Sequence, residues 1–250
     1  MSKRILSMMA AFLAAAALVL AQKPKSQKEV EALLAIQNAK TADARIAAVD
    51  ELITKFADTE FKAWALNLAA DAAKQKGDSA KAIIYAERAL EADPKYYLAM
   101  LLLSGELARS TREFDLDKEE KLARSEKYAK SAIELAGNAP KMNPNIPDDQ
   151  WAGIKKDFIS QAHEDLGMVA MVRKKYDTAI TEFKTAVDDA NTADPATMVR
   201  LATAYNQSGK PNDALSVLAK VLAMPNLNPA VKQFAESEKA RAEQSKNAKQ

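Results

Sequence analysis

The chain has 250 residues, with 36 Lys and Arg, 34 Asp and Glu, and a formal net charge of +2. It contains no cysteine, which excludes disulfides, thiol nucleophiles and cysteine-ligated zinc or iron–sulfur centres. Only six glycines occur in this alanine-rich sequence, a composition that favours long helices over sheets.

The N-terminus, residues 1–21, has the pattern of a secretory signal peptide. Lys3 and Arg4 form a basic start, an apolar run follows, and Ala21 is a small residue at a plausible cleavage site before Gln22. The alternative is an uncleaved anchor in the inner membrane, for which the run is short. Cleavage leaves 36 − 2 = 34 basic residues against 34 acidic ones. A neutral mature chain gives no reason to expect nucleic acid as a partner, and no stable membrane span is expected after cleavage.

A divergent helical unit is predicted directly after the signal. Residues 22–28 are polar and are expected to form a disordered lead-in. Beyond them apolar side chains recur every three or four residues through two segments, as in amphipathic helices. Ala48 lies 34 positions before Ala82, a spacing that returns further along the chain. We therefore predict a first helix–turn–helix unit at 29–62.

The clearest unit spans residues 63–96. Gly77 ends its first helix, Asp78 is suited to cap the second, and Pro94 stops that second helix. Small residues would let the two helices approach closely; they are Ala69, Ala70, Ala73, Ala82 and Ala89.

The next unit, 97–136, is predicted to be stretched at its turn. Asp117 is suited to cap the second helix of this unit. Phe114 and Leu116 lie in the lengthened turn and are expected to fold back onto the helix pair. Residues 137–149 follow with three prolines, which predicts a long loop.

A long helix is predicted from Trp151 to Lys174, capped by Asp148 or Asp149. Its first two turns extend beyond the repeat pattern and carry an apolar face that includes Trp151, Ile154 and Phe158.

Two more units are predicted at 160–194 and 195–228. Ala179 and Ala214 are 35 positions apart, and Gly209 marks the second turn. A last helix at 230–244 would cap the exposed end of the array, followed by a disordered tail at 245–250.

These units resemble the tetratricopeptide repeat (TPR), whose pattern is W-x2-L-G-x2-Y, A-x3-F and P over about 34 residues. In the 63–96 unit those slots hold Leu66, Ala69, Ala70, Ala73, Ala82, Ala86 and Pro94; no unit has a Trp in the Trp slot. The resemblance implies an all-α fold: a right-handed superhelical solenoid of stacked helix–turn–helix repeats with a C-terminal capping helix. It covers residues 29–244.

The resemblance also implies a function. In this family the first helices line a concave groove that holds a peptide or a partner helix, so the chain is expected to be a non-catalytic protein-interaction scaffold. Carried over by slot, the groove residues are Asn67, Asp71, Lys74, Leu101, Gly105, Glu164, Met168, Met171, Val199, Thr203 and Asn206. Some family members clamp a C-terminal carboxylate; here those slots hold Asn67, Asp71, Leu102, Gln161 and Asp165, of which only Asn67 is suitable.

The sequence leaves two other functions open. In the first, the protein is a cell-envelope assembly factor that docks a partner through the 137–149 loop and the Trp151 extension. In the second, it is an enzyme that uses His163, Glu164 or Asp165, but His163 is the only histidine and occupies a packing slot. No metal or cofactor motif is found. The signal and the resemblance together predict a periplasmic or secreted protein without cofactors.

Overall fold

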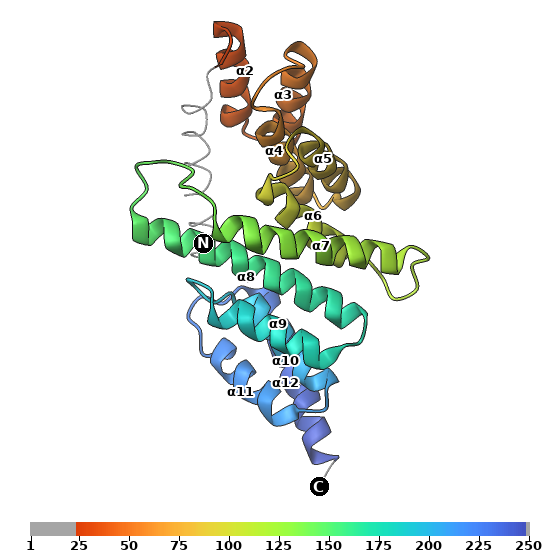
Figure 1. The fold of residues 1–250 in the computed structure, drawn as a ribbon. Helices are drawn as coiled ribbons and strands as arrows, with labels where there is room; N and C mark the ends of the chain where they lie inside the picture. Colours follow the sequence, from red (N-terminus) through yellow and green to blue (C-terminus); the bar gives the residue numbers. More distant parts are fainter. Residues whose placement is uncertain (1–23, 249–250) are drawn as a thin grey trace.

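The computed structural model describes residues 24–248, which form eleven α-helices and no strand (Figure 1). In chain order the helices are α2 (Gln27–Asn38), α3 (Ala42–Lys55), α4 (Lys62–Gln75), α5 (Ser79–Ala92), α6 (Tyr97–Ser110), α7 (Lys118–Gly137), α8 (Asp148–Val172), α9 (Tyr176–Asp188), α10 (Pro195–Gln207), α11 (Pro211–Leu222) and α12 (Pro229–Asn247). The predicted signal peptide lies outside the described residues.

The helices form consecutive hairpins that stack in chain order. Each first helix packs against its own second helix, and each second helix contacts the first helix of the following hairpin. First helices also touch one another directly, α4 with α6, α6 with α8 and α10 with α12. Figure 1 shows α2 and α3 at one end of the stack, α11 and α12 at the other, and α7 and α8 across the middle. The predicted all-α, stacked architecture is therefore confirmed.

The hairpin turns follow from backbone sterics. Gly77 and Gly209 have φ angles of 76° and 71°, in the left-handed region that disfavours side chains. The Asp78 side chain then accepts a hydrogen bond from the Lys81 backbone N–H at 3.0 Å and caps α5. In the α8–α9 turn the corresponding position is Lys174, with φ of 59°. The turn predictions at both glycines are confirmed.

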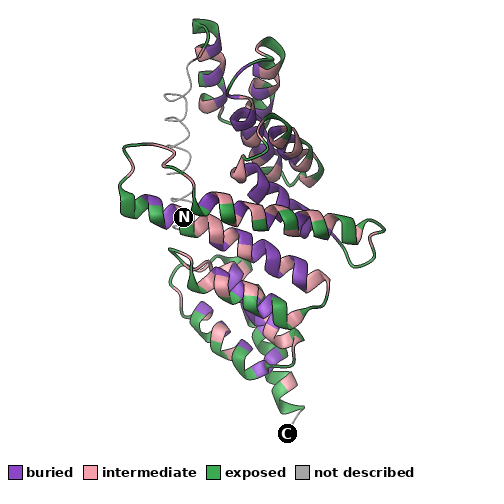
Figure 2. Cartoon of the chain, viewed as in Figure 1, coloured by how far each residue is buried: buried purple, intermediate pink, exposed green. Residues whose placement is uncertain are grey.

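Small residues set the distance between paired helices. Ala69, Ala73 and Ala82 are completely buried. Gly167 of α8 lies so close to α9 that a Cβ at this position would be 2.6 Å from the Phe183 ring. Figure 2 shows the buried residues running along α4 and α6. The hydrophobic core is divided, with one cluster drawn from α2–α6 and another from α10–α12.

The loop between α7 and α8 is tied to its own helices. The Trp151 indole Nε1 donates to the Ala139 carbonyl at 3.3 Å, and the Lys155 ammonium donates to the Gly137 carbonyl at 3.1 Å. Trp151 is only 5% exposed. The apolar start of α8 is therefore largely covered by the protein itself.

The α6–α7 turn differs from its prediction. Phe114 and Leu116 do not fold back onto the helices, because they are 89% and 107% exposed. Hydrogen bonds within the turn hold it outward: the Arg112 backbone N–H donates to the Asp115 carboxylate at 2.9 Å, and the Arg112 guanidinium donates to the Arg109 carbonyl at 2.7 Å.

Both ends of the array are also more ordered than expected. Lys25, within the predicted lead-in, forms a 2.6 Å ion pair with Asp58. Glu29 is buried and accepts a hydrogen bond from the Thr59 hydroxyl at 2.6 Å. At the other end α12 continues to Asn247, since its Lys, Glu and Ala residues are good helix formers. Asp117, Asp148 and Asp149 form no side-chain cap; Pro147 is the N-cap of α8.

Candidate partner-binding surface

The predicted groove residues lie on the first helices α4, α6, α8 and α10, but they differ in exposure. Leu101, Gly105, Glu164 and Val199 are buried between helices. The others are half-buried, namely Asn67, Asp71, Lys74, Met168, Met171, Thr203 and Asn206. A partner that lies along the first helices would meet the second group; their role in binding stays a prediction.

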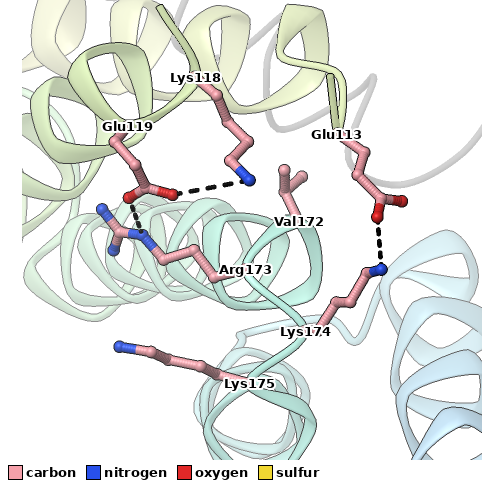
Figure 3. A pocket seen from close by; sticks show the side chains of 7 residues that line it. All are labelled: Glu113, Lys118, Glu119, Val172, Arg173, Lys174 and Lys175. Carbon is pink, nitrogen blue, oxygen red and sulfur yellow. Dashed lines mark hydrogen bonds and ion pairs between the residues drawn. The ribbon is translucent and has the colours of Figure 1, made fainter. Parts of the chain in front are cut away.

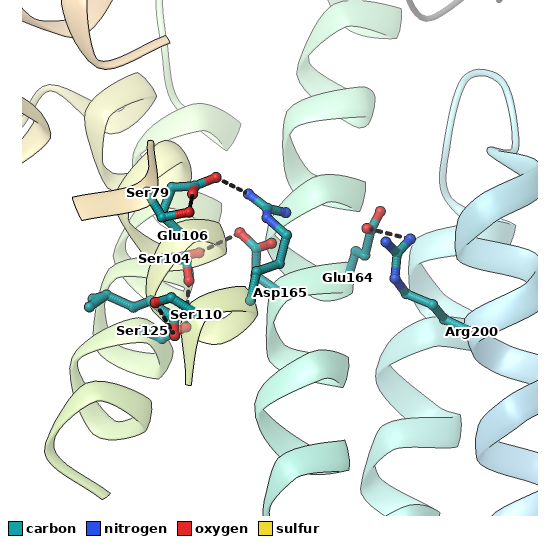
Figure 4. Close-up of polar contacts among 10 residues, drawn as sticks. Ser79, Ser104, Glu106, Ser110, Ser125, Glu164, Asp165 and Arg200 are labelled. Carbon is teal, nitrogen blue, oxygen red and sulfur yellow. Dashed lines mark hydrogen bonds and ion pairs between the residues drawn. The ribbon is translucent and has the colours of Figure 1, made fainter. Parts of the chain in front are cut away.

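Polar side chains link neighbouring helices, and we call them the polar seam: Ser79, Ser104, Glu106, Arg109, Glu164, Asp165, Thr197 and Arg200. Figure 4 labels six of them, Ser79, Ser104, Glu106, Glu164, Asp165 and Arg200. Glu106 of α6 accepts hydrogen bonds from the Ser79 hydroxyl at 2.7 Å and from the Arg109 guanidinium at 2.9 Å. Burial acts to raise the pKa of Glu106, but the hydrogen bonds from Ser79 and Arg109, together with the charges of Arg109 and Lys74, outweigh it and leave the pKa lower than usual. Glu106 is therefore a buried but stabilised carboxylate.

Asp165 of α8 is the most deeply buried acid of the polar seam. Its Oδ2 accepts a short hydrogen bond from the Ser104 hydroxyl of α6, whereas its buried Oδ1 has no hydrogen-bond partner among the described residues. Burial raises the pKa of Asp165 to about 7, although the nearby Arg109 charge and the Ser104 hydrogen bond act in the opposite direction. Gly105 makes this contact possible, since a Cβ there would lie 2.5 Å from the Arg109 guanidinium and 3.0 Å from Asp165 Oδ1.

The three residues of the enzymatic alternative point to three different helices. His163 Nδ1 lies 2.8 Å from Glu182 of α9. Glu164 accepts a hydrogen bond from the Thr197 hydroxyl of α10 at 2.6 Å and pairs with Arg200 at 3.1 Å. Asp165 faces α6, as described above. The structure therefore does not bring these side chains together around one space where a substrate could react.

Some of the half-buried groove residues have polar groups without a partner inside the protein. Lys74 forms no hydrogen bond or ion pair with any described residue, although its charge lies near Glu106 and Asp165. The Asn67 side-chain oxygen is buried without a hydrogen-bond donor in the described part of the chain. The Asn206 oxygen is likewise buried without a donor in the described part of the chain, but its amide nitrogen donates to the Glu238 carbonyl and carboxylate of α12 at 3.0 and 2.8 Å. The capping helix thus occupies this end of the surface.

Comparison with known proteins identifies one of the repeats. The family model described as a tetratricopeptide repeat matches residues 65–96. A thermophilic TPR protein from Thermus thermophilus is similar in structure, with a TM-score of 0.56 and 19% identity over 79% of this chain and 90% of that chain. The chain carries a tetratricopeptide repeat within a TPR-like solenoid.

Two further solved structures are similar at lower scores. A TPR protein from Parabacteroides merdae has a TM-score of 0.38 and 14% identity, over 93% of this chain and 91% of that chain. The assembly chaperone of RpL4 has a TM-score of 0.41 and 12% identity, over 84% of this chain and 94% of that chain. Scores this low add nothing to the assignment. No curated protein matches the sequence.

Within the TPR-like array, the carboxylate-clamp slots contain two buried residues, Leu102 and Asp165. Ser104, Glu106 and Arg109 of α6, three of the eight residues of the polar seam, were not predicted as site residues from the sequence. One signal was available: an acid three positions before a base, at Glu106 and Arg109, in an otherwise apolar helix.

Residues 24–248 contain no candidate metal centre and no candidate membrane-spanning helix. No cluster of three or more His, Cys, Asp or Glu side chains is arranged there to hold a metal ion. None of the helices described there combines the length and hydropathy needed to cross a bilayer.

Proposed function

We propose that this protein is an exported, non-catalytic scaffold that binds a peptide or a partner helix along its first helices. The TPR-like fold supports a role in protein–protein interaction. The observation that carries the finer proposal is the row of half-buried side chains on α4 and α8. It combines an amide (Asn67), a cation without an internal ion pair (Lys74) and two thioethers (Met168 and Met171).

Each of these side chains would make a different kind of contact with a bound partner. The Asn67 oxygen is buried, so the amide nitrogen of this half-buried side chain is the group that a backbone carbonyl of a bound peptide would meet. Methionine side chains adapt to differently shaped apolar residues. The polar seam beside them is hydrogen-bonded between helices, so it would hold the first helices in register while the partner binds.

The triple variant Asn67→Ala, Lys74→Ala, Met171→Ala should lose the partner. We expect immobilised wild-type protein to retain a specific protein from a cell-envelope extract and the variant to retain less than a tenth of it. Circular dichroism would confirm that the variant keeps its helices.

A second triple variant provides the matched control. Lys127→Ala, Thr181→Ala and Lys220→Ala alter exposed positions on the second helices and should retain the partner fully. Equal retention by both triple variants would contradict binding along the first helices.

Export is part of the same proposal and has its own test. The mature protein recovered from a periplasmic fraction should begin at Gln22, as read by mass spectrometry of the N-terminal peptide. A chain that retains Met1 and sediments with membranes would instead support the uncleaved anchor.

Docking through the 137–149 loop is the alternative as an envelope assembly factor. The structure gives it less support, because Trp151, part of the expected docking surface, is buried and hydrogen-bonded to the loop. Only exposed loop residues such as Pro144 and Asn145 would then be left for a partner.

A further inference from the structure

A second surface lies away from the first-helix row, at the turns on one side of the array. A hollow of about 630 Å³ opens between the α6–α7 turn, the start of α7 and the end of α8 (Figure 3). Its lining is dominated by charged side chains: Glu113, Lys118, Glu119, Arg173, Lys174 and Lys175. We call this hollow, together with the exposed Phe114 and Leu116 of the α6–α7 turn, the turn patch.

The charges of the hollow do not balance. Lys174 pairs with Glu113, and Arg173 lies 3.0 Å from Glu119. Lys118 reaches Glu119 only loosely, at 3.9 Å. Lys175 is exposed, and in Figure 3 its side chain points away from Glu113 and Lys174. Its ammonium group forms no hydrogen bond or ion pair with the residues the structure describes. Arg173 also pairs with Glu126 at 2.7 Å, so three acids face the four cations. Lys175 is the cation that remains without an ion pair, and a carboxylate would neutralise it.

Exposed apolar side chains adjoin this charge. Five large hydrophobic residues are exposed in the described chain, and the two most exposed, Phe114 and Leu116, both lie in this one turn. A single exposed Leu needs no explanation, but two large side chains presented together are typical of a contact surface.

The α6–α7 turn is held in the presenting conformation. Besides the Arg112 hydrogen bonds, the Lys118 backbone N–H donates to the Asp115 carbonyl at 3.2 Å, and Lys121 pairs with Asp117 at 2.9 Å. A partner would therefore lose little free energy in ordering this turn.

The acidic residues of the same turn disfavour some classes of anionic partner. Glu113, Asp115 and Asp117 alternate with the apolar residues. A continuous anionic surface, such as a lipid bilayer or a phosphate backbone, would meet these carboxylates as well as the lysines. A discrete acidic side chain can reach the Lys175 side of the hollow and avoid them.

We propose that the turn patch docks an acidic segment of a partner protein, with a carboxylate at Lys175 and an apolar residue of the same segment against Phe114 and Leu116. This surface is separate from the first-helix row, and the proposal does not depend on binding there.

The test is a selection from a phage library of random dodecapeptides on the immobilised full-length chain, with counter-selection on a Phe114→Ser, Leu116→Ser, Lys175→Glu variant. Peptides retained by wild type alone should be enriched in Asp or Glu next to Leu, Ile or Phe. In fluorescence anisotropy, Lys175→Glu should weaken a selected peptide at least tenfold, and raising NaCl from 0.05 to 0.5 M should also weaken it.

The variant Lys74→Ala, on the first helices, should leave this peptide affinity unchanged, which separates the two surfaces. No acidic enrichment, or enrichment in Lys and Arg, would overturn the proposal. Co-sedimentation with vesicles containing anionic lipid, abolished by Lys175→Glu in a protein that selects no acidic peptide, would assign the patch to a membrane instead.

Discussion

Replacing Asp165 by Asn should stabilise the protein at pH 8 and remove a pH dependence that the wild type shows. The buried carboxyl has a pKa raised from 3.8 to about 7, because burial disfavours its charged form. Each unit corresponds to about 1.4 kcal/mol, so ionising Asp165 costs the folded state on the order of 4 kcal/mol. We expect the melting temperature at pH 8 to rise by about 5 °C or more.

The direction of the pH effect follows from proton linkage. The folded state binds the Asp165 proton more tightly than the unfolded state does. The contribution of the protonated Asp165 to folding stability is therefore complete below about pH 4 and is lost as the pH rises to about 7. The charged groups around Asp165, which are Lys74 of α4, Arg109 of α6 and Glu164 of α8, are present in both proteins. The difference between variant and wild type should thus grow between pH 4 and 7 and stay constant above it.

Thermal denaturation followed by circular dichroism at pH 4.5, 6 and 8 measures this difference. Asp189→Asn, at an exposed acid that ends α9, is the control and should show no such growth. A difference between Asp165→Asn and wild type that is equal at all three pH values would show that Asp165 does not retain its proton in the folded state.

Gly167→Ala should destabilise the protein by about 1–3 kcal/mol, the usual cost of overpacking a core. A Cβ at 167 would lie 2.6 Å from the Phe183 ring, and Phe183 is 1% exposed and has no room to move. The same change should reverse its sign in a Phe183→Ala background, where the ring is absent and alanine favours the helix by up to about 1 kcal/mol.

Urea denaturation of the wild type, both single variants and the double variant measures this coupling. Gly137→Ala is the matched control: residue 137 ends α7 with open space where the Cβ would lie, so it should be neutral or slightly stabilising in either background. The same loss from Gly167→Ala in both backgrounds would rule out the Phe183 contact as its cause.

The repeat architecture could be predicted because its information is local. Alanines at 82, 179 and 214, and glycines at 77 and 209, report how each helix packs on its neighbour in sequence. Hairpins built in this way can only bury their apolar faces by stacking, so the order of helices follows.

The polar seam could not be predicted in the same way. Ser104 and Asp165 are 61 positions apart, on helices that do not follow one another in the chain. Their contact depends on how far α8 is displaced along α6, which no single-repeat spacing encodes. The prediction for the α6–α7 turn was wrong for a different reason. Phe114 and Leu116 are exposed, against the general rule that large apolar residues are buried.

The division of the hydrophobic core has a mechanical consequence. The clusters of α2–α6 and of α10–α12 are linked by smaller clusters from α6, α7, α8, α9 and α10, so strain at one end would reach the other through the central helices. A ligand bound along α4 would then act on the far end one hairpin at a time.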